Sequence, residues 1–276
     1  MSFSYIRRYT GPVEALIFDN AGTLVDFGST APVMAFVEIF RRRGVEATVA
    51  EARGPMGAAK RDHIAQMCAM PGLATRWAQV HGQPPGDTDI DAMYAEFLPL
   101  QVQCLADYST VIPGALDVID ILREEGRKIG TTTGYPREVL EVLSGKLAEQ
   151  GLVPDNTVCA SDVAHGRPRP DMCLKSALDL SVTCVQACVN VDDSAPGIEA
   201  GLAAGMWTVG LACSGNEVGL SYDEWTSLTE DAQDDLREKA AAKLRHAGAH
   251  YVIDTVADIV EVIDDIDARL AAGDAP

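Results

Sequence analysis

Short apolar runs alternate with amphipathic segments along most of the chain. Each run is typical of a buried strand and is followed by a turn and by apolar residues at helical spacing. We expect strands over Val13–Phe18, Lys128–Thr132, Thr157–Cys159, Ala187–Val191, Trp207–Leu211 and His250–Ile253. This alternation predicts an α/β fold, a Rossmann-like doubly wound parallel sheet with helices on both faces.

One long segment after the first predicted strand breaks the alternation. From about Thr30 to Ala106 the pattern is helical throughout and is punctuated by Gly, Pro and Asp. We therefore expect an inserted all-α helical cap domain over residues 28–107. The core would then consist of residues 1–27, with the first strand, and residues 108–276.

Composition narrows the classes of partner. The 22 Lys and Arg against 41 Asp and Glu give a net charge of −19, which disfavours binding to nucleic acid or to an anionic membrane surface. We find no apolar run long enough to span a bilayer and no signal peptide after the N-terminal arginines. Seven cysteines without a CxxC motif indicate reduced thiols, so we expect a cytoplasmic protein. The acidic charge still allows a small anionic substrate, because a metal and a few Arg or Lys can make one cleft locally positive.

Carboxylates follow two of the predicted strands. Asp19 ends the first strand, where a buried carboxylate is costly unless it is paired or bound to metal. Asp192 and Asp193 follow the fourth strand and repel one another unless a cation compensates, and Mg²⁺ prefers such oxygen ligands. Each feature alone also fits a structural interpretation, a capped turn at Asp19 and an acidic helix N-terminus at the pair.

Groups able to hold an anion follow two other strands. Hydroxyls and loop amides at Thr132, Thr133, Gly134 and Tyr135 suit phosphate oxygens. Arg167 lies in the constrained loop GRPRP, and a guanidinium grips a phosphoryl group in bidentate fashion. Thr-rich strand ends and arginines in proline turns are also frequent without any ligand.

The order of these groups resembles the haloacid dehalogenase superfamily. An Asp-x-x-x-Thr loop, a Thr, a cation and an Asp pair each follow a strand. The resemblance implies that Asp19 is a nucleophile and that Arg167 binds phosphate together with Thr133 or Thr132. It also implies that the inserted block is the superfamily's helical cap.

The same resemblance implies a magnesium site. Its ligands would be Asp19, Asp193 and the carbonyl of Ala21, with Asp192 assisting. Ala21 is also a departure, because phosphomonoesterases of the superfamily carry there an Asp that protonates the leaving alkoxide. Alanine cannot donate a proton, so the leaving group needs a different stabiliser.

The cap segment EARGPMGAAKRDH offers that stabiliser. It places Met56, Lys60 and His63 at helical spacing. A lysine can condense with a carbonyl to form an imine, which accepts the electrons of a carbanion. Most helix lysines are nonetheless solvated, and a lone helix histidine is more often structural.

Together with the Asp-x-Ala-Gly-Thr loop, this segment resembles the phosphonoacetaldehyde hydrolase (phosphonatase) family. The stretches MAFVEIFRRRGV, TTGYPRE, GRPRP and AGMWTVG extend the likeness over nearly the whole chain. The resemblance implies hydrolysis of the C–P bond of phosphonoacetaldehyde to acetaldehyde and phosphate. It implies a Lys60 Schiff base, an Asp19 aspartyl phosphate, His63 as proton shuttle, and a homodimer.

Such chemistry needs a neutral Lys60, whose reference pKa is about 10.4. We expect a closed, partly apolar cap, with Met56 and Tyr135 as walls, to lower the pKa toward ~7–8. Closure must also bring Lys60 to Asp19. The apolar first cap helix, with Phe36 and Phe40, fits either a dimer surface or the cap's own core.

Two further departures bear on the substrate. Asn20 stands where the family commonly has an aromatic residue, and Ser29 where it often has Cys. We expect both to line the cleft, which leaves a substituted phosphonate aldehyde open as substrate.

Three rival functions remain to be weighed. A phosphate monoesterase is disfavoured by Ala21, and a 2-haloacid dehalogenase by the Asp pair and Lys60. A non-catalytic binding protein on the same scaffold would not need the nucleophile Asp19.

Overall fold

The computed structural model describes residues 8–56, 58, 60–105 and 108–276. Within them, one sheet has the strand order β3-β2-β1-β4-β5-β6, and every neighbouring pair is parallel. The strands are β1 (Ala15–Asp19), β2 (Lys128–Thr133), β3 (Asn156–Cys159), β4 (Cys188–Asp192), β5 (Trp207–Leu211) and β6 (Tyr251–Ile253). All the expected strands are present, with ends shifted by at most two residues, and the doubly wound parallel sheet is confirmed.

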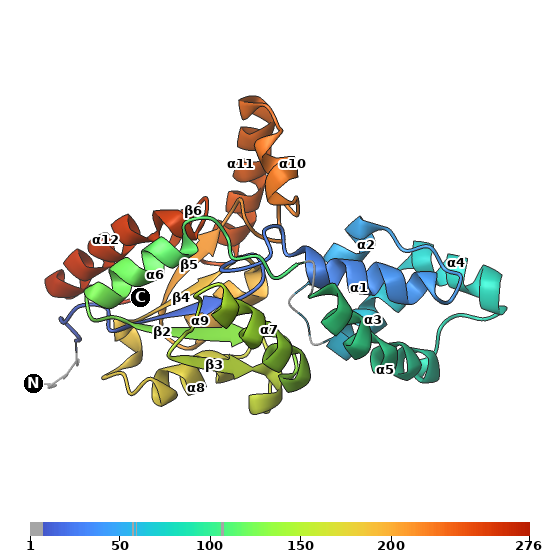
Figure 1. Cartoon of the computed structure of the whole chain (residues 1–276), viewed down its shortest axis with the longest axis horizontal. Coiled ribbons are helices and arrows are strands. Elements are labelled where there is room, and N and C mark those ends of the chain that lie inside the picture. The colour runs from blue at the N-terminus through green and yellow to red at the C-terminus, as the bar shows by residue number, and fades with distance from the viewer. Residues whose placement is uncertain (1–7, 57, 59, 106–107) are drawn as a thin grey trace, which may run out of the picture.

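Helices cover both faces of the sheet because alternate strand residues point to opposite sides. In β1, Leu16 and Phe18 pack under one helical layer, and Ala15 and Ile17 pack under the other. The first layer consists of α6 (Ala115–Glu124), α7 (Arg137–Glu149) and α12 (Ile259–Ala272); the second consists of α8 (Asp171–Asp179), α9 (Ala195–Ala203) and α11 (Glu230–His246). The short α10 (Tyr222–Thr226) precedes α11, and both stand at the top of Figure 1.

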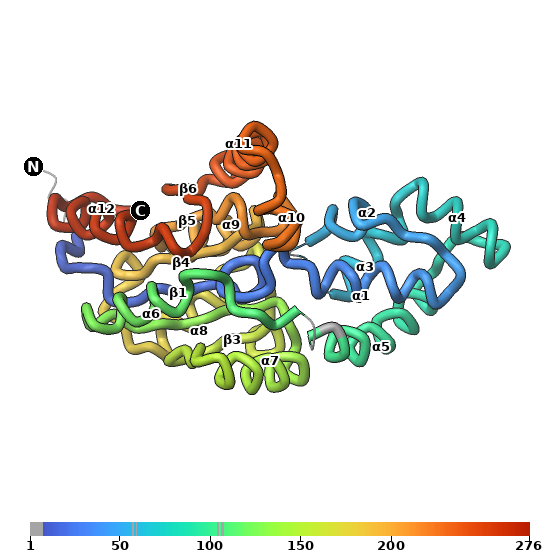
Figure 2. The backbone as a smooth tube through the Cα atoms, turned by 45° about the horizontal axis from the view of Figure 1, so that its top comes forward, coloured from blue at the N-terminus to red at the C-terminus, as the bar shows by residue number. Residues whose placement is uncertain are grey.

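The cap forms a second lobe beside the core, as Figures 1 and 2 show. Its helices are α1 (Thr30–Arg41), α2 (Val49–Arg53), α3 (Lys60–Ala69), α4 (Pro71–His81) and α5 (Asp87–Cys104). They enclose their own apolar cluster, with Phe36, Phe40, Met67, Trp77 and Phe97 fully buried. The apolar face of α1 therefore belongs to the cap's core and gives no support for a dimer surface.

The expectation of one helical spacing from Met56 to His63 is wrong. α2 ends at Arg53 and α3 begins at Lys60, so Met56 lies in the turn between them. Gly54 still has helical φ and ψ, but Pro55 after it has no backbone N–H with which to continue the hydrogen bonding of α2.

Two adjacent segments join the cap to the core. Val25 forms an antiparallel bridge with Val111. On either side of it, the Asp26 amide donates to the Thr110 carbonyl at 3.0 Å, and the Ile112 amide donates to the Leu24 carbonyl at 2.8 Å. The predicted boundary at 27/28 lies in the first segment, and the predicted boundary at 107/108 touches residues outside the described ranges.

The topology decides where a ligand meets the core. β1 lies between β2 and β4, so the chain winds in opposite directions on its two sides. Ligands of open parallel sheets bind at such a switch point, beyond the carboxyl ends of the strands. Among the described helices, none has the length and apolar character needed to cross a membrane.

Candidate active site

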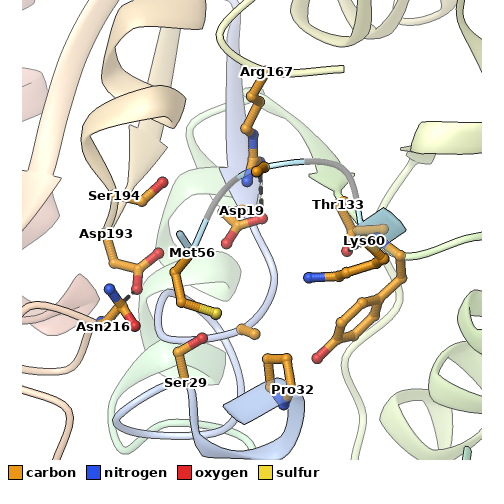
Figure 3. A pocket seen from close by; sticks show the side chains of 14 residues that line it. Asp19, Ser29, Pro32, Met56, Lys60, Thr133, Arg167, Asp193, Ser194 and Asn216 are labelled. Carbon is orange, nitrogen blue, oxygen red and sulfur yellow. Dashed lines mark hydrogen bonds and ion pairs between the residues drawn. The ribbon is translucent and has the colours of Figure 1, made fainter. Parts of the chain in front are cut away.

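A cavity that opens to solvent lies where the carboxyl ends of the central strands face the cap. The core contributes Asp19, Ala21, Thr133, Gly134, Tyr135, Arg167, Asp193, Ser194 and Asn216; the connector and cap contribute Ser29, Pro32, Met56, Ala58 and Lys60. Figure 3 shows the Lys60 amine extending into this space, with Asp19 and Asp193 across it. The structure thus brings together most of the residues that the sequence singled out.

Arg167 holds the carboxylate of Asp19 in place. Its Nη2 donates to Asp19 Oδ1 and to Thr132 Oγ1, both at 2.8 Å, and lies 3.1 Å from Asp192 Oδ2. Burial opposes the positive charge, but the carboxylates of Asp19 and Asp192 outweigh it and raise the pKa of Arg167. Arg167 therefore stays charged, and the contacts described for it engage only one of its nitrogens.

The two threonines at the end of β2 have different positions. Thr133 lines the cavity, and its hydroxyl accepts from the Tyr135 amide at 3.2 Å. That amide orients the hydroxyl so that its proton can be donated to a bound oxygen. Thr132 contacts Arg167 instead, because successive strand side chains point to opposite sides.

The carboxylates of Asp19, Asp192 and Asp193 form a buried cluster, with one oxygen of each lying within 4.8 Å of the others. Asp192 Oδ1 accepts from the amide and the hydroxyl of Ser194, at 3.0 and 2.8 Å, and Asp193 Oδ2 accepts from the Asn216 amide at 2.7 Å. Burial and the neighbouring carboxylates raise the pKa of Asp193 well above its ordinary value. Such a concentration of oxygen ligands and negative charge fits a divalent cation.

Glycines let the backbone close in around this cluster. A Cβ on Gly197 would lie 1.9 Å from Cγ of Asp192. A Cβ on Gly215 would lie 2.3 Å from Cβ of Asp193. The acidic side chains therefore occupy the space that side chains at 197 and 215 would need.

Lys60 is the cationic group of the cap that lines this cavity. Its Nζ lies 5.8 Å from the centroid of the Tyr135 ring and 5.7 Å from that of Phe36. Burial lowers the pKa of Lys60 to about 8, with Asp19 opposing the shift and Arg167 adding to it. About a tenth of the amine is therefore neutral at pH 7, far more than for a lysine with the ordinary pKa.

His63 lies one turn beyond Lys60, inside the cap. Its ring stacks on Phe36 with centroids 3.7 Å apart, and its Nε2 lies 2.8 Å from the carbonyl oxygen of Ala52. Burial, and then the charge of Lys60, lower the pKa of His63 to about 3. The ring is therefore neutral. With Nε2 assigned as the donor, Nδ1 is a buried acceptor that has no hydrogen-bond partner among the described residues.

Comparisons with known proteins bear on this geometry. A family model for haloacid dehalogenase-like hydrolases matches residues 13–205. Phosphonoacetaldehyde hydrolase of Hahella chejuensis is 46% identical over 100% of this chain and 94% of its own length. That of Vibrio cholerae serotype O1 is 49% identical over 96% of this chain and 98% of its own. The chain belongs to the phosphonoacetaldehyde hydrolase family, within the haloacid dehalogenase-like hydrolases.

A solved structure supports the same assignment. The crystal structure of a phosphonoacetaldehyde hydrolase like protein from Oleispira antarctica is 48% identical, with a TM-score of 0.97 and full coverage of both chains. A β-phosphoglucomutase from Clostridium difficile, at 18% identity and a TM-score of 0.67, shares the fold. The assignment to the phosphonoacetaldehyde hydrolases thus rests on the close relatives.

Of the two departures from the phosphonoacetaldehyde hydrolase pattern, one lies elsewhere than expected. Ser29 lines the cavity, as predicted. Asn20 does not: it lines a separate cavity with Thr131 and Ser144 beneath α7. The side chain after Asp19 points to the opposite side of the sheet, so Asn20 has no position beside the ligand.

Asn216 also lines the cavity of this phosphonoacetaldehyde hydrolase relative and was not predicted from the sequence. It lies in the loop that follows β5, at the same edge of the sheet as the other site loops. That position after a predicted strand was the available signal. Pro32, at the start of α1, gave no comparable signal.

Proposed function

We propose that this chain hydrolyses the C–P bond of phosphonoacetaldehyde, releasing acetaldehyde and phosphate. The observation that carries the proposal is the meeting of Lys60 and Asp19 at one cavity, beside the methyl group of Ala21. An amine can activate the aldehyde, and a carboxylate can take up the phosphoryl group. The leaving group is a carbon whose electrons pass into the imine, so no acid is needed at the position of Ala21.

The first stage takes place at Lys60. Its neutral amine attacks the aldehyde carbon, water leaves, and a protonated imine remains. The lowered pKa of Lys60, about 8, supplies the neutral amine. The imine then withdraws electrons from the adjacent carbon that bears phosphorus.

The second stage takes place at Asp19. A carboxylate oxygen attacks phosphorus, the C–P bond breaks, and its electrons move into the imine to give an enamine and an aspartyl phosphate. Water hydrolyses the aspartyl phosphate. Protonation of the enamine carbon and hydrolysis of the resulting imine free Lys60 and acetaldehyde, so that one water is consumed overall.

The remaining core groups bind and orient the phosphonate. The Thr133 hydroxyl, the Gly134 loop and the unengaged nitrogens of Arg167 stabilise charge on the phosphoryl oxygens. Arg167 also fixes the carboxylate of Asp19 for attack.

Mg²⁺ is the cofactor that we propose. Asp19, Asp193 and the Ala21 carbonyl would hold it, and when bound it supplies positive charge that offsets the repulsion between nucleophile and phosphonate. Asp192 would assist through its negative charge, because Ser194 and Arg167 already contact its two oxygens.

Around the reacting atoms, less polar side chains from both the cap and the core exclude water. Met56, Pro32 and Tyr135 form the less polar side of the cavity, and Ser29 sets the room left for a substituent on the substrate. His63 lies one helical turn from Lys60 with Nδ1 as a buried acceptor, but its pKa of about 3 makes the ring a weak base. A shuttle role for His63 stays a prediction.

Assembly and location are further parts of the proposal. We place the enzyme in the cytoplasm because the six cysteines with described side chains are free thiols. A homodimer is proposed on the family resemblance alone.

The decisive experiment is borohydride trapping. Wild-type protein mixed with phosphonoacetaldehyde and borohydride should lose activity and carry an N-ethyl group on the peptide that contains Lys60. Lys60→Arg should abolish both trapping and phosphate release. The matched control is Lys175→Arg, since Lys175 is a surface lysine paired with Asp179. Turnover of a phosphate monoester without any lysine adduct would overturn the proposal.

A further inference from the structure

Arg53, the last residue of α2, reaches from the cap to the core. Its Nη1 donates to the Gly28 carbonyl at 2.8 Å and lies 3.1 Å from Asn216 Oδ1. Its Nη2 donates to the Gly219 carbonyl at 2.8 Å. One acceptor from the segment that enters the cap and two from the core loop after β5 therefore converge on one guanidinium of the cap.

The binding site of this guanidinium, called its seat below, consists of Gly28, Asn216 and Gly219 and fits a planar group closely. Gly219 has φ +68°, and a Cβ on it would lie 2.6 Å from Cζ of Arg53. The backbone there can approach the flat guanidinium only because residue 219 is glycine. The planar fork of arginine reaches three acceptors at once, which a lysine ammonium at the same position cannot reproduce.

Other described arginines of the cap behave differently. Arg43 pairs with Glu96, Arg61 with Asp91, and Arg76 with Glu51, each inside the cap. Arg53 alone among them is tied to core acceptors. Its burial lowers its pKa, and the negative charges of Asp26 and Asp193 oppose that shift. A guanidinium stays charged in proteins, so these core groups favour its seated position.

The acceptors of Arg53 are connected both to the hinge, meaning the segment around Gly28 that leads from the core into the cap, and to the acidic cluster. The Gly28 amide donates to the Ser214 carbonyl at 2.7 Å. In the same loop, the Asn216 amide donates to Asp193 Oδ2 at 2.7 Å. A guanidinium that binds Gly28 and Asn216 thus touches the start of the cap and the loop that orients Asp193.

We propose that Arg53 is a positioning residue that latches the cap onto the core in the arrangement where Lys60 faces Asp19. Lys60 follows Arg53 by seven positions in the chain, so the seat of one restricts the position of the other. Arg53 lies outside the residues that line the cavity and acts through Asn216 and the hinge. The inference rests on the proposed function, which requires the two catalytic groups to meet.

The first test compares Arg53→Ala with Arg43→Ala, which removes an arginine paired inside the cap. We expect kcat/KM for phosphonoacetaldehyde to fall about 100-fold for Arg53→Ala, because misplacement of a reacting group costs that order of rate. Arg43→Ala should stay within about twofold of wild type, as expected for loss of a surface ion pair.

Chemical rescue separates a latch from a general structural role. Guanidinium ion at millimolar concentration should restore at least about tenfold of the rate lost in Arg53→Ala, since it refills a preformed seat. It should not affect Arg43→Ala. A loss of rate that guanidinium does not restore would overturn the latch. If Arg53→Ala fails to fold, Arg53→Lys, which keeps the charge, serves as the test variant. A wild-type rate in Arg53→Lys would also overturn the latch.

Solution scattering tests the latch without reference to turnover. With phosphate added to populate the closed state, Arg53→Ala should have a larger radius of gyration than wild type, and Arg43→Ala should match wild type. Equal radii for Arg53→Ala and wild type would overturn the latch. Failure of wild type to hydrolyse phosphonoacetaldehyde would instead overturn the proposed function.

Discussion

The cavity has a core wall, formed by residues of the core, and a cap wall, formed by residues of the cap. In the core wall the carboxylates are hydrogen-bonded to neighbours, whereas the cap wall presents one amine among apolar side chains. In the core, Arg167 bonds to Asp19, and Asn216 bonds to Asp193. In the cap, Lys60 lies near the Phe36 ring without an ion-pair partner at contact distance among the described residues.

The difference matches two chemical tasks. Under the proposed function, hydrogen bonds hold the carboxylates in a fixed geometry, as a nucleophile and a metal site require. An amine in an apolar setting loses its proton more easily, as imine formation requires. Because the two tasks need opposite environments, a fold that separates them into two lobes can satisfy both, and the groups meet at the one cavity that both lobes line.

The largest expected effect comes from Asp19→Asn, which tests whether the walls act separately. The amide has the shape of the carboxylate but cannot attack phosphorus, so phosphate release should fall by about 10⁴-fold or more. Trapping by borohydride at Lys60 should persist, since the amine belongs to the cap. Loss of trapping in Asp19→Asn would contradict the separation.

A smaller effect is expected from Gly197→Ala, which probes how closely the core wall is packed. The new Cβ would lie within 2.1 Å of the carboxylate atoms of Asp192. We expect a loss of about 3 kcal/mol in the free energy of unfolding, measured by urea denaturation.

The matched control is Gly145→Ala in α7, where a Cβ meets nothing within 4 Å. It should stabilise by about 0.5–1 kcal/mol, because alanine favours the helix. Equal stability of the two variants would show that the wall can relax around Asp192.

The smallest effect is a pH dependence that arises from the cap wall. Because burial lowers the pKa of Lys60 to about 8, the fraction of neutral amine rises with pH through that value. The initial rate of borohydride trapping should increase about tenfold per pH unit below about 8 and level off above it. A midpoint near the ordinary value for lysine, about 10.4, would mean that Lys60 is solvated when it reacts.

Much of the fold was predictable because its signals are local. Each strand of the sheet centre is buried on both faces and therefore appears as an apolar run, as in β1 and β5. The cap was predictable as a block without strands. Its division at Pro55 was missed because Met56 and Lys60 keep a helical spacing across the break.

The site was predictable where residues end strands, as at Asp19, Thr133 and Asp193. The contacts between them were not, because they join distant parts of the chain. Arg167 and Asp19 are 148 positions apart, and Arg53 and Asn216 are 163 apart. Asn20 directly follows β1, and the residue types alone do not reveal whether its side chain points into the cavity or to the other side of the sheet.

The insertion of the cap after β1 also affects the order in which the chain can fold during synthesis. Ala15 pairs with Lys128 and Cys188, both of which follow the whole cap in the chain and leave the ribosome after it. The cap encloses its own apolar cluster and can form first. The nascent β1 must therefore remain unpaired, with its apolar side chains exposed, until the far side of the cap emerges. During that interval this strand is the part of the chain most open to chaperones and to aggregation.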